Sequence, residues 1–266
     1  AYGIAPCNPA QSQTTLTIVP AVTVYAGLDE STCKGNQFTI SSAISSNSVS
    51  YIWSSTGSGT LANNTSLTPT YIPATGETGL VKLTIVATGN SPCPVMTDVM
   101  QLFFQDSPTA FAGNNANICQ NTSYTIPNAS ASNYSNYTWS HNGTGNLTNV
   151  NTLSPTYHPE INESGIVTIT LTSSGLSNCL PASHSMNLSI DPLPIANAGP
   201  DEVSCQGFPF TVSGASAANQ STLQWVESGS GSLINPNALV PVYTPAPIET
   251  GVVILTLKVA GSQACY

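Results

Sequence analysis

Seven cysteines are the residues of this sequence whose type and spacing most clearly point to chemistry. They stand at positions 7, 33, 93, 119, 179, 205 and 265. The gaps between them alternate between 26 and 60 residues, so the cysteines recur with a period of 86 residues. No histidine recurs with them, which disfavours a metal site. An odd number of periodic cysteines in this composition indicates disulfides formed in an oxidising compartment.

The same period of 86 residues governs the rest of the chain. Trp53, Trp139 and Trp225 obey it. The motif GSGTL at 57 returns as GTGNL at 143 and GSGSL at 229, and ETG at 77 returns as ESG at 163 and ETG at 249. LTPTYIP at 67 returns as LSPTYHP at 153 and LVPVYTP at 239. Ungapped self-similarity on this scale indicates a tandem array of one structural unit.

The period also predicts the domain limits. Residues 1–20 are expected to be the C-terminal strand of a preceding repeat, because TTLTIVP at 14 aligns with MQLFFQD at 100. Residues 21–106 form repeat 1 and residues 107–192 form repeat 2. Residues 193–266 form repeat 3, which stops after its second cysteine and lacks its last strand. The chain is therefore expected to be a piece of a longer protein.

Each repeat is predicted to consist of short β-strands, because apolar residues alternate between turn residues and no segment has helical periodicity. In repeat 1 the expected strands A, A′, B, C, C′, E, F and G cover residues 21–26, 28–33, 36–43, 49–55, 59–62, 67–72, 79–88 and 95–105. Such a set, with a tryptophan on strand C, is typical of an immunoglobulin-like sandwich. Because strand G runs through prolines into the next strand A, without a Gly/Ser linker, we predict an all-β fold of tandem immunoglobulin-like sandwiches in a rod-like array.

Three disulfide pairings respect the period. They are a bridge within a repeat (Cys33–Cys93), a bridge across 26 residues (Cys93–Cys119), and a bridge between neighbouring repeats (Cys33–Cys179 and Cys119–Cys265). In a head-to-tail sandwich the A′–B turn and the F–G turn lie at opposite ends, about 25–35 Å apart. A disulfide needs Cα atoms within about 7 Å. This geometry favours the third pairing.

The bridge within a repeat stays open as an alternative if the strands are shorter or the A′–B turn folds back. On the favoured pairing, the partners of three cysteines lie outside this segment. These are Cys7, Cys93 and Cys205.

The composition excludes several classes of partner. Charged residues make up 6% of the chain, arginine is absent and the net charge is −9, so little can neutralise the phosphates of nucleic acid or bind an anionic membrane. No run reaches the roughly 18 apolar residues that a membrane helix needs, so membrane insertion is not expected. Hydrophobic residues nevertheless form 40% of the chain, enough to build a core.

The stretches ANAGPDEVSCQGFPFTVSGA and TGVVILTLKVAGSQAC, with the Trp…GSGSL…Tyr-Thr-Pro pattern between them, resemble the tandem PKD/Ig-like repeats of large Bacteroidota cell-surface adhesins. The type they resemble is the SprB-like gliding adhesin. Asn115 stands where the other repeats have Asp29 and Asp201, which is a departure from the pattern. The resemblance implies export by the type IX system and extracellular display on the outer membrane as an adhesive filament. Surface polysaccharide or the gliding and secretion machinery would then be partners, besides neighbouring repeats.

Each recurring side chain has a structural and a functional interpretation. The three tryptophans are expected in the core of strand C, the alternative being platforms for stacking sugars. Tyr71, Tyr157 and Tyr243, each two residues before a proline, are expected to pack the turn before strand F. Glu77, Glu163 and Glu249 are carboxylates present in all three repeats and either accept backbone N–H bonds or bind calcium. Asp29, Glu30, Asp201 and Glu202 lie near junctions, where a stiffening ion would need Asn115 in repeat 2.

No catalytic set is visible. His141, His158 and His184 have no counterparts in the other repeats and are expected on the surface, without a recurring Ser/His/Asp set. The chain is therefore predicted not to be an enzyme and to need no cofactor, calcium apart. The leading hypothesis is a force-bearing structural and adhesive stalk segment. The alternative is an array of carbohydrate-binding modules, for which Tyr134 and Tyr137 in repeat 2 are weak support.

Overall fold

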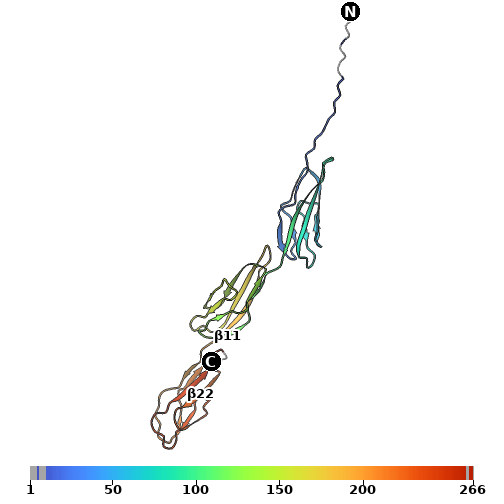
Figure 1. The fold of residues 1–266 in the computed structure, drawn as a ribbon. Helices are drawn as coiled ribbons and strands as arrows, with labels where there is room; N and C mark the ends of the chain where they lie inside the picture. Colours follow the sequence, from blue (N-terminus) through green and yellow to red (C-terminus); the bar gives the residue numbers. More distant parts are fainter. Residues whose placement is uncertain (1–4, 6–9, 262–263, 266) are drawn as a thin grey trace. The chain divides into compact units, whose positions relative to one another are not determined.

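The structure, a computed structural model, describes residues 5, 10–261 and 264–265. Every regular element in these residues is a β-strand, which confirms the predicted all-β fold (Figure 1). No helix long and apolar enough to cross a membrane occurs in the described part of the chain. Cys7 lies outside the described residues.

Repeat 1 folds into two groups of strands that share one core. Its strands are β1 (Thr23–Tyr25), β2 (Glu30–Cys33), β3 (Phe38–Thr39), β4 (Ile44–Ser46), β5 (Ser48–Ser55), β6 (Thr60–Ala62), β7 (Thr70–Ile72), β8 (Gly79–Gly89) and β9 (Met96–Gln105). One sheet has the order β2-β9-β8-β5, in which β2 is parallel to β9 and the other neighbours are antiparallel. The second group pairs β1 with β4 and β3-β7-β6. Side chains from both groups, such as Ile40, Tyr71 and Leu83, pack together in one buried cluster.

Repeat 2 has the same topology. Its strands are β10 (Thr109–Phe111), β11 (Ala116–Cys119), β12 (Tyr124–Thr125), β13 (Ser130–Ser132), β14 (Tyr134–His141), β15 (Asn146–Thr148), β16 (Thr156–His158), β17 (Gly165–Gly175) and β18 (Ala182–Asp191). The orders are β11-β18-β17-β14, β10-β13 and β12-β16-β15. The 86-residue period of the sequence is thus a period of the strand pairing as well.

The predicted strand B over residues 36–43 differs from the structure, in which only the two-residue strand β3 lies within these residues and β4 follows directly after them. β3 pairs with β7, and β4 pairs with β1. The backbone N–H of Ile40 still bonds to the carbonyl of Pro69 at 3.0 Å, so the chain changes its pairing partner after this residue. The segment therefore pairs first with β7 and then with β1. The alternation of apolar and polar residues does not show where the partner strand changes.

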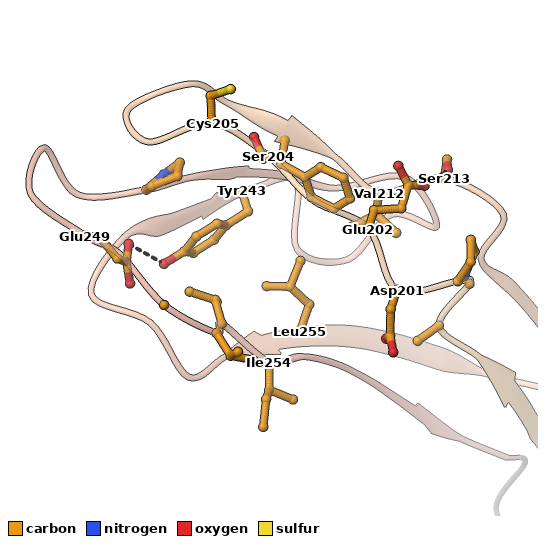
Figure 2. A pocket seen from close by; sticks show the side chains of 18 of the residues that line it. Asp201, Glu202, Ser204, Cys205, Val212, Ser213, Tyr243, Glu249, Ile254 and Leu255 are labelled. Atoms are coloured by element: carbon orange, nitrogen blue, oxygen red, sulfur yellow. Dashed lines mark hydrogen bonds between the residues drawn. The ribbon is translucent and has the colours of Figure 1, made fainter.

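Repeat 3 shows what strand G contributes to the other two. Its strands are β19 (Ile195–Asn197), β20 (Phe210–Thr211), β21 (Ser216–Ala218), β22 (Thr222–Glu227), β23 (Ser232–Ile234), β24 (Val242–Thr244) and β25 (Leu255–Ala260). β25 has 6 residues, whereas β8 and β17 each have 11. Residues 79–82 of β8 pair only with β9, and the equivalent residues 251–254 form no strand. The buried cluster has three residues, Val212, Trp225 and Leu257, and an open groove lies beside Tyr243 and Leu255 (Figure 2).

By compactness the chain divides into two units. One comprises Ala1–Asp106 with Ser177–Cys179, and the other comprises Ser107–Leu176 with Leu180–Tyr266. Cys179 therefore belongs to the first unit, although repeat 2 surrounds it in the sequence. Cys119 and Cys265 both belong to the second.

Candidate functional site

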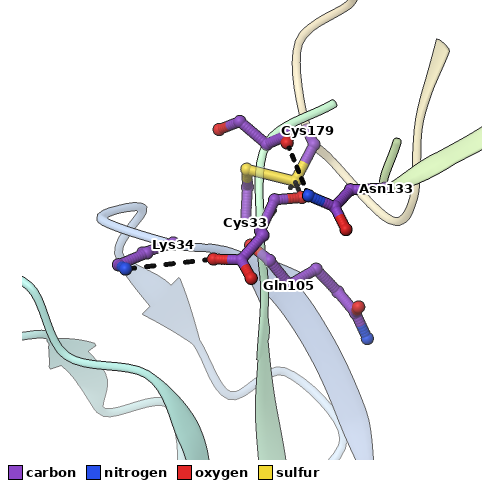
Figure 3. A network of polar contacts seen from close by, with 7 residues as sticks. Cys33, Lys34, Gln105, Asn133 and Cys179 are labelled. Carbon is purple, nitrogen blue, oxygen red and sulfur yellow. Dashed lines mark hydrogen bonds and ion pairs between the residues drawn. A yellow bond between two sulfur atoms is a disulfide. The ribbon is translucent and has the colours of Figure 1, made fainter. Parts of the chain in front are cut away.

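The first candidate site is a disulfide between Cys33 and Cys179, whose Cα atoms lie 4.8 Å apart (Figure 3). Cys33 ends strand β2 and is paired in parallel register with Gln105, the last residue of β9. The Sγ atom of Cys179 lies 3.8 Å from the carbonyl oxygen of Gln105 and 3.7 Å from that of Asp106. Both cysteines are buried. The bond thus forms at the point where strand G leaves its sandwich.

The second disulfide repeats this arrangement in the second unit. Cys119 ends β11 and is paired with Asp191, the last residue of β18. Cys265 bonds to Cys119 with a Cα separation of 4.9 Å, and its Sγ lies 3.4 Å from the carbonyl oxygen of Asp191. We call each of these disulfides, with its two cysteines, a clip. The structure therefore contains the pairing that the strand topology favoured.

Local hydrogen bonds explain why each clip cysteine stays in place. A turn follows the first cysteine of each repeat: the N–H of Asn36 bonds to the carbonyl of Cys33 at 2.9 Å, and that of Thr122 to Cys119 at 3.1 Å. The next residue continues the parallel pairing, since the N–H of Lys34 bonds to the carbonyl of Gln105 at 2.8 Å. The ion pair between Lys34 and Asp106 at 3.9 Å is exposed, so it adds at most about 1 kcal/mol (Figure 3).

Two cysteines among the described residues are free thiols, Cys93 and Cys205. Cys93 occupies the F–G turn of repeat 1 and donates its S–H to the carbonyl of Pro20 at 3.6 Å. Cys205 is exposed, and the N–H of Phe208 bonds to its carbonyl at 3.2 Å. The two thiols therefore stand in the same local settings as the clip cysteines, without a bonded partner.

The recurring tyrosine and glutamate form one motif in every repeat. The buried Tyr71 hydroxyl donates to Glu77 Oε1 at 2.8 Å and accepts the N–H of Gly59 at 2.9 Å. Glu77 also accepts the N–H of Ser58 at 2.8 Å and of Ala74 at 3.0 Å. The pair Tyr157–Glu163 repeats these contacts. So does the pair Tyr243–Glu249, which Figure 2 shows. The motif therefore ties the C–C′ turn to the E–F turn.

The Gly-x-Gly of each repeat is required by this motif. A Cβ atom on Gly57 would overlap the Tyr71 hydroxyl and the Glu77 carboxylate. A Cβ on Gly59 would overlap the carbonyl oxygen of Ile72. The motifs around Gly57, Tyr71 and Glu77 are separate in the sequence but pack against one another in the structure.

These contacts shift the ionisation of both side chains. Burial alone would raise the pKa of the Glu77 carboxyl, but hydrogen bonds from Tyr71 and from the N–H groups of Ala74 and Ser58 outweigh it and lower the pKa. In repeat 2, burial and then the bond to Glu163 raise the pKa of Tyr157 to about 12. The ionised glutamate and the neutral tyrosine are therefore the forms that the fold stabilises.

The predicted calcium role of Glu77, Glu163 and Glu249 meets donors rather than carbonyl oxygens at the carboxylate. Backbone N–H groups and a hydroxyl point at these oxygens, which suits an anion and gives a cation few ligands. In the described part of the chain, no three His, Cys, Asp or Glu side chains gather as a metal site would. Calcium binding stays a prediction that the structure does not test.

The junction carboxylates have a defined contact in repeat 1. Asp29 Oδ1 accepts the N–H of Gln101 on β9 at 2.7 Å, and Asn115 Oδ1 accepts the N–H of Asn187 on β18 at 2.8 Å. The side-chain oxygen of either aspartate or asparagine can accept this backbone N–H, so asparagine can replace aspartate in repeat 2. Glu202 instead accepts the Ser213 hydroxyl at 2.6 Å.

The tryptophans lie on strand C as the sequence suggested, but they are not equally covered. Trp53 and Trp225 are each 2% exposed, while Trp139 is half-buried and packs against the edge of the core. The indole N–H of Trp53 donates to the carbonyl of Ser66 at 3.0 Å, and that of Trp139 to Thr152 at 3.1 Å. The indoles of Trp53 and Trp139 are thus held by hydrogen bonds to the chain, whereas the buried indole N–H of Trp225 has no hydrogen-bond partner among the described residues.

The histidines do not converge on one site. His184 Nδ1 accepts the N–H of Ala112 at 3.1 Å, the place that Asp98 takes toward Ala26 in repeat 1 at 2.7 Å. His158 bonds to the Ser123 hydroxyl at 2.8 Å. The ring of His141 lies against that of Tyr157, with centroids 5.2 Å apart.

The aromatic pair of repeat 2 does come together. The rings of Tyr134 and Tyr137 meet edge to face with centroids 5.3 Å apart, and Tyr134 is exposed. The Tyr137 hydroxyl donates to the carbonyl of Asn151 at 2.8 Å, which fixes the orientation of its ring.

Sequence reasoning missed a periodic asparagine whose side chain bonds to the start of each repeat, and which in repeat 1 lies between β4 and β5. Asn47 has φ = 58°, and its Nδ2 donates to the carbonyl of Ala21 at 2.8 Å. Asn133 does the same to Ser107 at 3.2 Å, and Asn219 to Leu193 at 3.0 Å. The period was visible at 47, 133 and 219, but the abundance of asparagine in the chain hid it. These side chains tether strand A where it enters each sandwich.

Solved structures of tandem immunoglobulin domains are similar to this chain. A structure of three Ig domains of titin, in an E-to-A mutated variant, aligns with 86% of this chain and 89% of its own at 14% identity and a TM-score of 0.52. An I-band fragment of titin aligns over the same shares at 14% identity and a TM-score of 0.50. No protein-family model matches the sequence, and no curated protein does. The fold is therefore a tandem array of immunoglobulin-like sandwiches, as the sequence predicted.

Proposed function

We propose that this chain is a force-bearing segment of a secreted, structural and adhesive filament. The observation that carries the proposal is the pair of overlapping clips. Cys33–Cys179 and Cys119–Cys265 each join residues 146 positions apart, and the two closed loops share residues 119–179. Clips placed in this way limit how far the chain lengthens when one of its sandwiches opens.

The overlap gives tension three parallel routes between Cys33 and Cys265. One runs along the chain to Cys119 and crosses the second clip, and another crosses the first clip to Cys179 and continues along the chain. Each of these two routes contains 86 residues (33 to 119, and 179 to 265). The third route crosses both clips and uses the 60 residues between Cys119 and Cys179, so it is the shortest and sets the limit of extension. Neither sandwich can therefore lengthen fully while the clips hold.

Single-molecule pulling from both ends tests this proposal. With the clips intact, the stretch from Cys33 to Cys265 is expected to extend to about 200 Å at roughly 3.6 Å per residue, because the 60 residues from 119 to 179 connect the two clips. After reduction the same stretch contains 232 residues (33 to 265) and is expected to reach about 800 Å. A chain with all four clip cysteines replaced by serine is the control, and it should behave like the reduced protein in both conditions. Equal extension of the oxidised and reduced chains would exclude the load-bearing role.

An extracellular location is supported by the same chemistry, because disulfides persist in oxidising compartments. The finer assignment, a gliding or attachment adhesin exported by the type IX system, is supported by the sequence resemblance. Protease treatment of intact cells is the direct test, since an exposed filament is removed and an internal protein survives. Loss of attachment or gliding on deletion of the gene would support the adhesive role, and unchanged attachment would contradict it.

Carbohydrate binding is a second candidate, favoured by the Tyr134–Tyr137 pair alone. Repeats 1 and 3 have Ser48 and Gln220 where repeat 2 has Tyr134, so an exposed aromatic platform occurs at this position in repeat 2 only. Binding of the chain to a panel of polysaccharides, compared with its Tyr134→Ala variant, tests this alternative. Retention that the variant does not weaken would remove it.

A further inference from the structure

The outward side of one sheet in repeat 1 is apolar. In the sheet β2-β9-β8-β5, alternate side chains such as Leu83 and Met100 belong to the buried cluster, and the residues between them point outward. The solvent side of such a sheet normally carries polar residues. Here it carries five apolar residues of β5, β8 and β9, which we call the outer face: Ile52, Leu80, Val86, Val99 and Phe103. All except the half-buried Val86 are 42–53% exposed.

The strand register places these five side chains in two neighbouring groups. Ile52 lies opposite Val86, and Val99 lies diagonally across from Val86 on β9. Leu80 lies opposite Phe103. Directly opposite and diagonal residues on one face of a sheet are close enough for their side chains to touch. Contiguous apolar surface of this kind on a folded domain marks an interaction site.

Repeat 2 shows that the fold itself does not require an apolar outer face. Its strand order is the same, but four of the five equivalent residues are polar: Thr138, Ile166, Thr172, Ser185 and Ser189. Hydroxyls on this face bond to one another, Thr170 to Ser185 at 2.8 Å and Thr172 to Ser183 at 2.9 Å. The face of repeat 2 is thus suited to water, and the face of repeat 1 is suited to a partner.

The outer face of repeat 1 also carries one charge of each sign, on either side of Gln101. Lys82 on β8 lies opposite Gln101 on β9, between the two apolar groups. Asp29 lies on the other side, where its Oδ2 accepts the side-chain N–H of Gln101 at 3.3 Å. Lys82 forms no ion pair among the described residues. The equivalent residues of repeat 2 are all uncharged: Thr168, Asn187 and Asn115.

We propose that the outer face of repeat 1 binds the same face of a second copy of this chain. A two-fold axis parallel to the strands, between β8 and β9, sets Leu80 of each copy against Phe103 of the other. The same axis sets Lys82 of each copy against Gln101 and Asp29 of the other, so the pairing of opposite charges occurs twice. A face whose apolar groups and charges match across such an axis is complementary to itself, as a two-fold contact requires.

The size of the face fits a weak, reversible contact. The nine residues of β8 that pair with β9 extend about 30 Å, and four strands at about 4.8 Å each are about 19 Å wide. Each copy would therefore cover about 550 Å², and the pair about 1,100 Å², slightly more than the roughly 1,000 Å² that a specific interface needs. The two sheets would pack face to face, about 10 Å apart, as the sheets of a sandwich do.

Self-association of this kind goes beyond the proposed function, because it does not depend on the clips or on the surface that the filament contacts. Sedimentation equilibrium of the purified chain tests it, with the clips intact and the free thiols alkylated so that no covalent dimer forms. We expect a monomer–dimer equilibrium with a Kd between about 10 μM and 1 mM, in keeping with the small area.

Serine substitutions copied from repeat 2 test the apolar part of the face. Val99→Ser with Phe103→Ser should raise the Kd at least about tenfold while leaving the core intact, because both side chains point outward. The matched control is Ile44→Ser, which removes an apolar residue that is 64% exposed on β4, outside this sheet. It should leave the Kd unchanged. Circular dichroism checks that each variant is folded.

Charge variants test the predicted axis. Lys82→Glu sets two carboxylates against each other and should leave the chain monomeric. Asp29→Asn keeps an oxygen that can accept the N–H of Gln101, as Asn115 does in repeat 2, and should raise the Kd several-fold. Lys82→Thr should have much less effect in the Asp29→Asn background than alone, because both changes remove the same charge pair.

Four results would overturn the proposal. These are a wild-type chain that is monomeric at every concentration, including one whose outer face binds some other molecule, and a dimer that survives the paired serine substitutions. The others are an equal loss of dimer with Ile44→Ser, and independent effects of Lys82→Thr and Asp29→Asn on the Kd.

Discussion

Cys33 and Cys179 are 146 residues apart in the sequence, yet their Cα atoms lie 4.8 Å apart beside Gln105, the last residue of strand β9. The A′ strand reaches this place because it pairs in parallel with strand G. A cysteine at the end of A′ is therefore always next to the residue where the chain leaves the sandwich. The clip therefore holds the end of the A′ strand at the place where the chain leaves the sandwich.

Loss of a clip is expected to destabilise the chain strongly. Closing a loop of more than a hundred residues restricts the unfolded chain by about 5 kcal/mol in the chain-entropy model. We expect Cys33→Ser to lower the free energy of unfolding of the first unit by an amount approaching this value, as measured in a denaturant titration under oxidising conditions.

The double variant Cys33→Ser with Cys179→Ser should be no less stable than either single variant, because both changes remove the same bond. Cys205→Ser, which removes no clip cysteine, is the matched control and should leave the unfolding transition unchanged. Additive losses in the double variant would mean that the thiols act through packing.

Removal of a single hydroxyl in the tyrosine–glutamate motif should be measurable. Tyr71→Phe leaves the N–H of Gly59 without its partner and removes one of the two hydrogen bonds to Glu77 Oε1, which keeps the bond from Ser58. An unsatisfied buried polar group costs about 1–3 kcal/mol. We expect a loss of stability in that range by urea titration. Tyr25→Phe, at an exposed position, should change little. Equal effects of the two substitutions would remove the structural role of the motif.

The same motif predicts an acid limit to stability. The folded pKa of Glu163 is lowered by hydrogen bonds from Thr144, Tyr157 and Glu160 that outweigh the effect of burial. A lowered folded pKa means a contribution that is present above the unfolded value of about 4.3 and is lost as the pH falls through the folded pKa. We expect the free energy of unfolding to decrease below about pH 4, and Glu163→Gln to show a smaller decrease over the same range. Parallel curves for the two proteins would refute this.

Tyrosine sets the alkaline limit with the opposite sign. The pKa of Tyr157 is raised to about 12 in the folded chain, against about 10 when unfolded. Its contribution is complete below about pH 10 and is lost as the pH rises toward about 12. Tyr157→Phe should therefore remove part of the alkaline decrease in stability, followed by circular dichroism. An unchanged alkaline transition would show that other groups control it.

The repeat, the rough positions of most strands and the all-β fold were readable from the sequence because each rests on alternation and spacing. The features that could not be predicted depend on another segment of the chain, either a partner strand or the side chains that cover a residue. Glu202–Cys205 match Glu30–Cys33 in the period but form no strand, since a parallel A′ strand exists only against strand G. Trp139 occupies the position of Trp53 and is nevertheless less covered, because burial depends on the neighbouring side chains.

The asparagine tether at the start of each sandwich offers the sharpest single-residue test. Asn47 combines two properties: its backbone has φ = 58°, and its side chain bonds to the carbonyl of Ala21. Asn47→Gly keeps the backbone conformation and loses the tether, whereas Asn47→Ala loses the tether and adds strain of roughly 1–2 kcal/mol for a left-handed residue. We therefore expect stability to decrease in the order Asn, Gly, Ala.

Hydrogen exchange locates the effect. Both variants should accelerate exchange at Thr23 and Tyr25 of β1, because the tether holds this strand against β4, while Val167 in repeat 2 should exchange as before. If glycine matches asparagine in stability and in exchange, the conformation of the turn is the whole contribution. If alanine matches glycine, the side-chain bond is what holds strand A in place and the positive φ adds nothing.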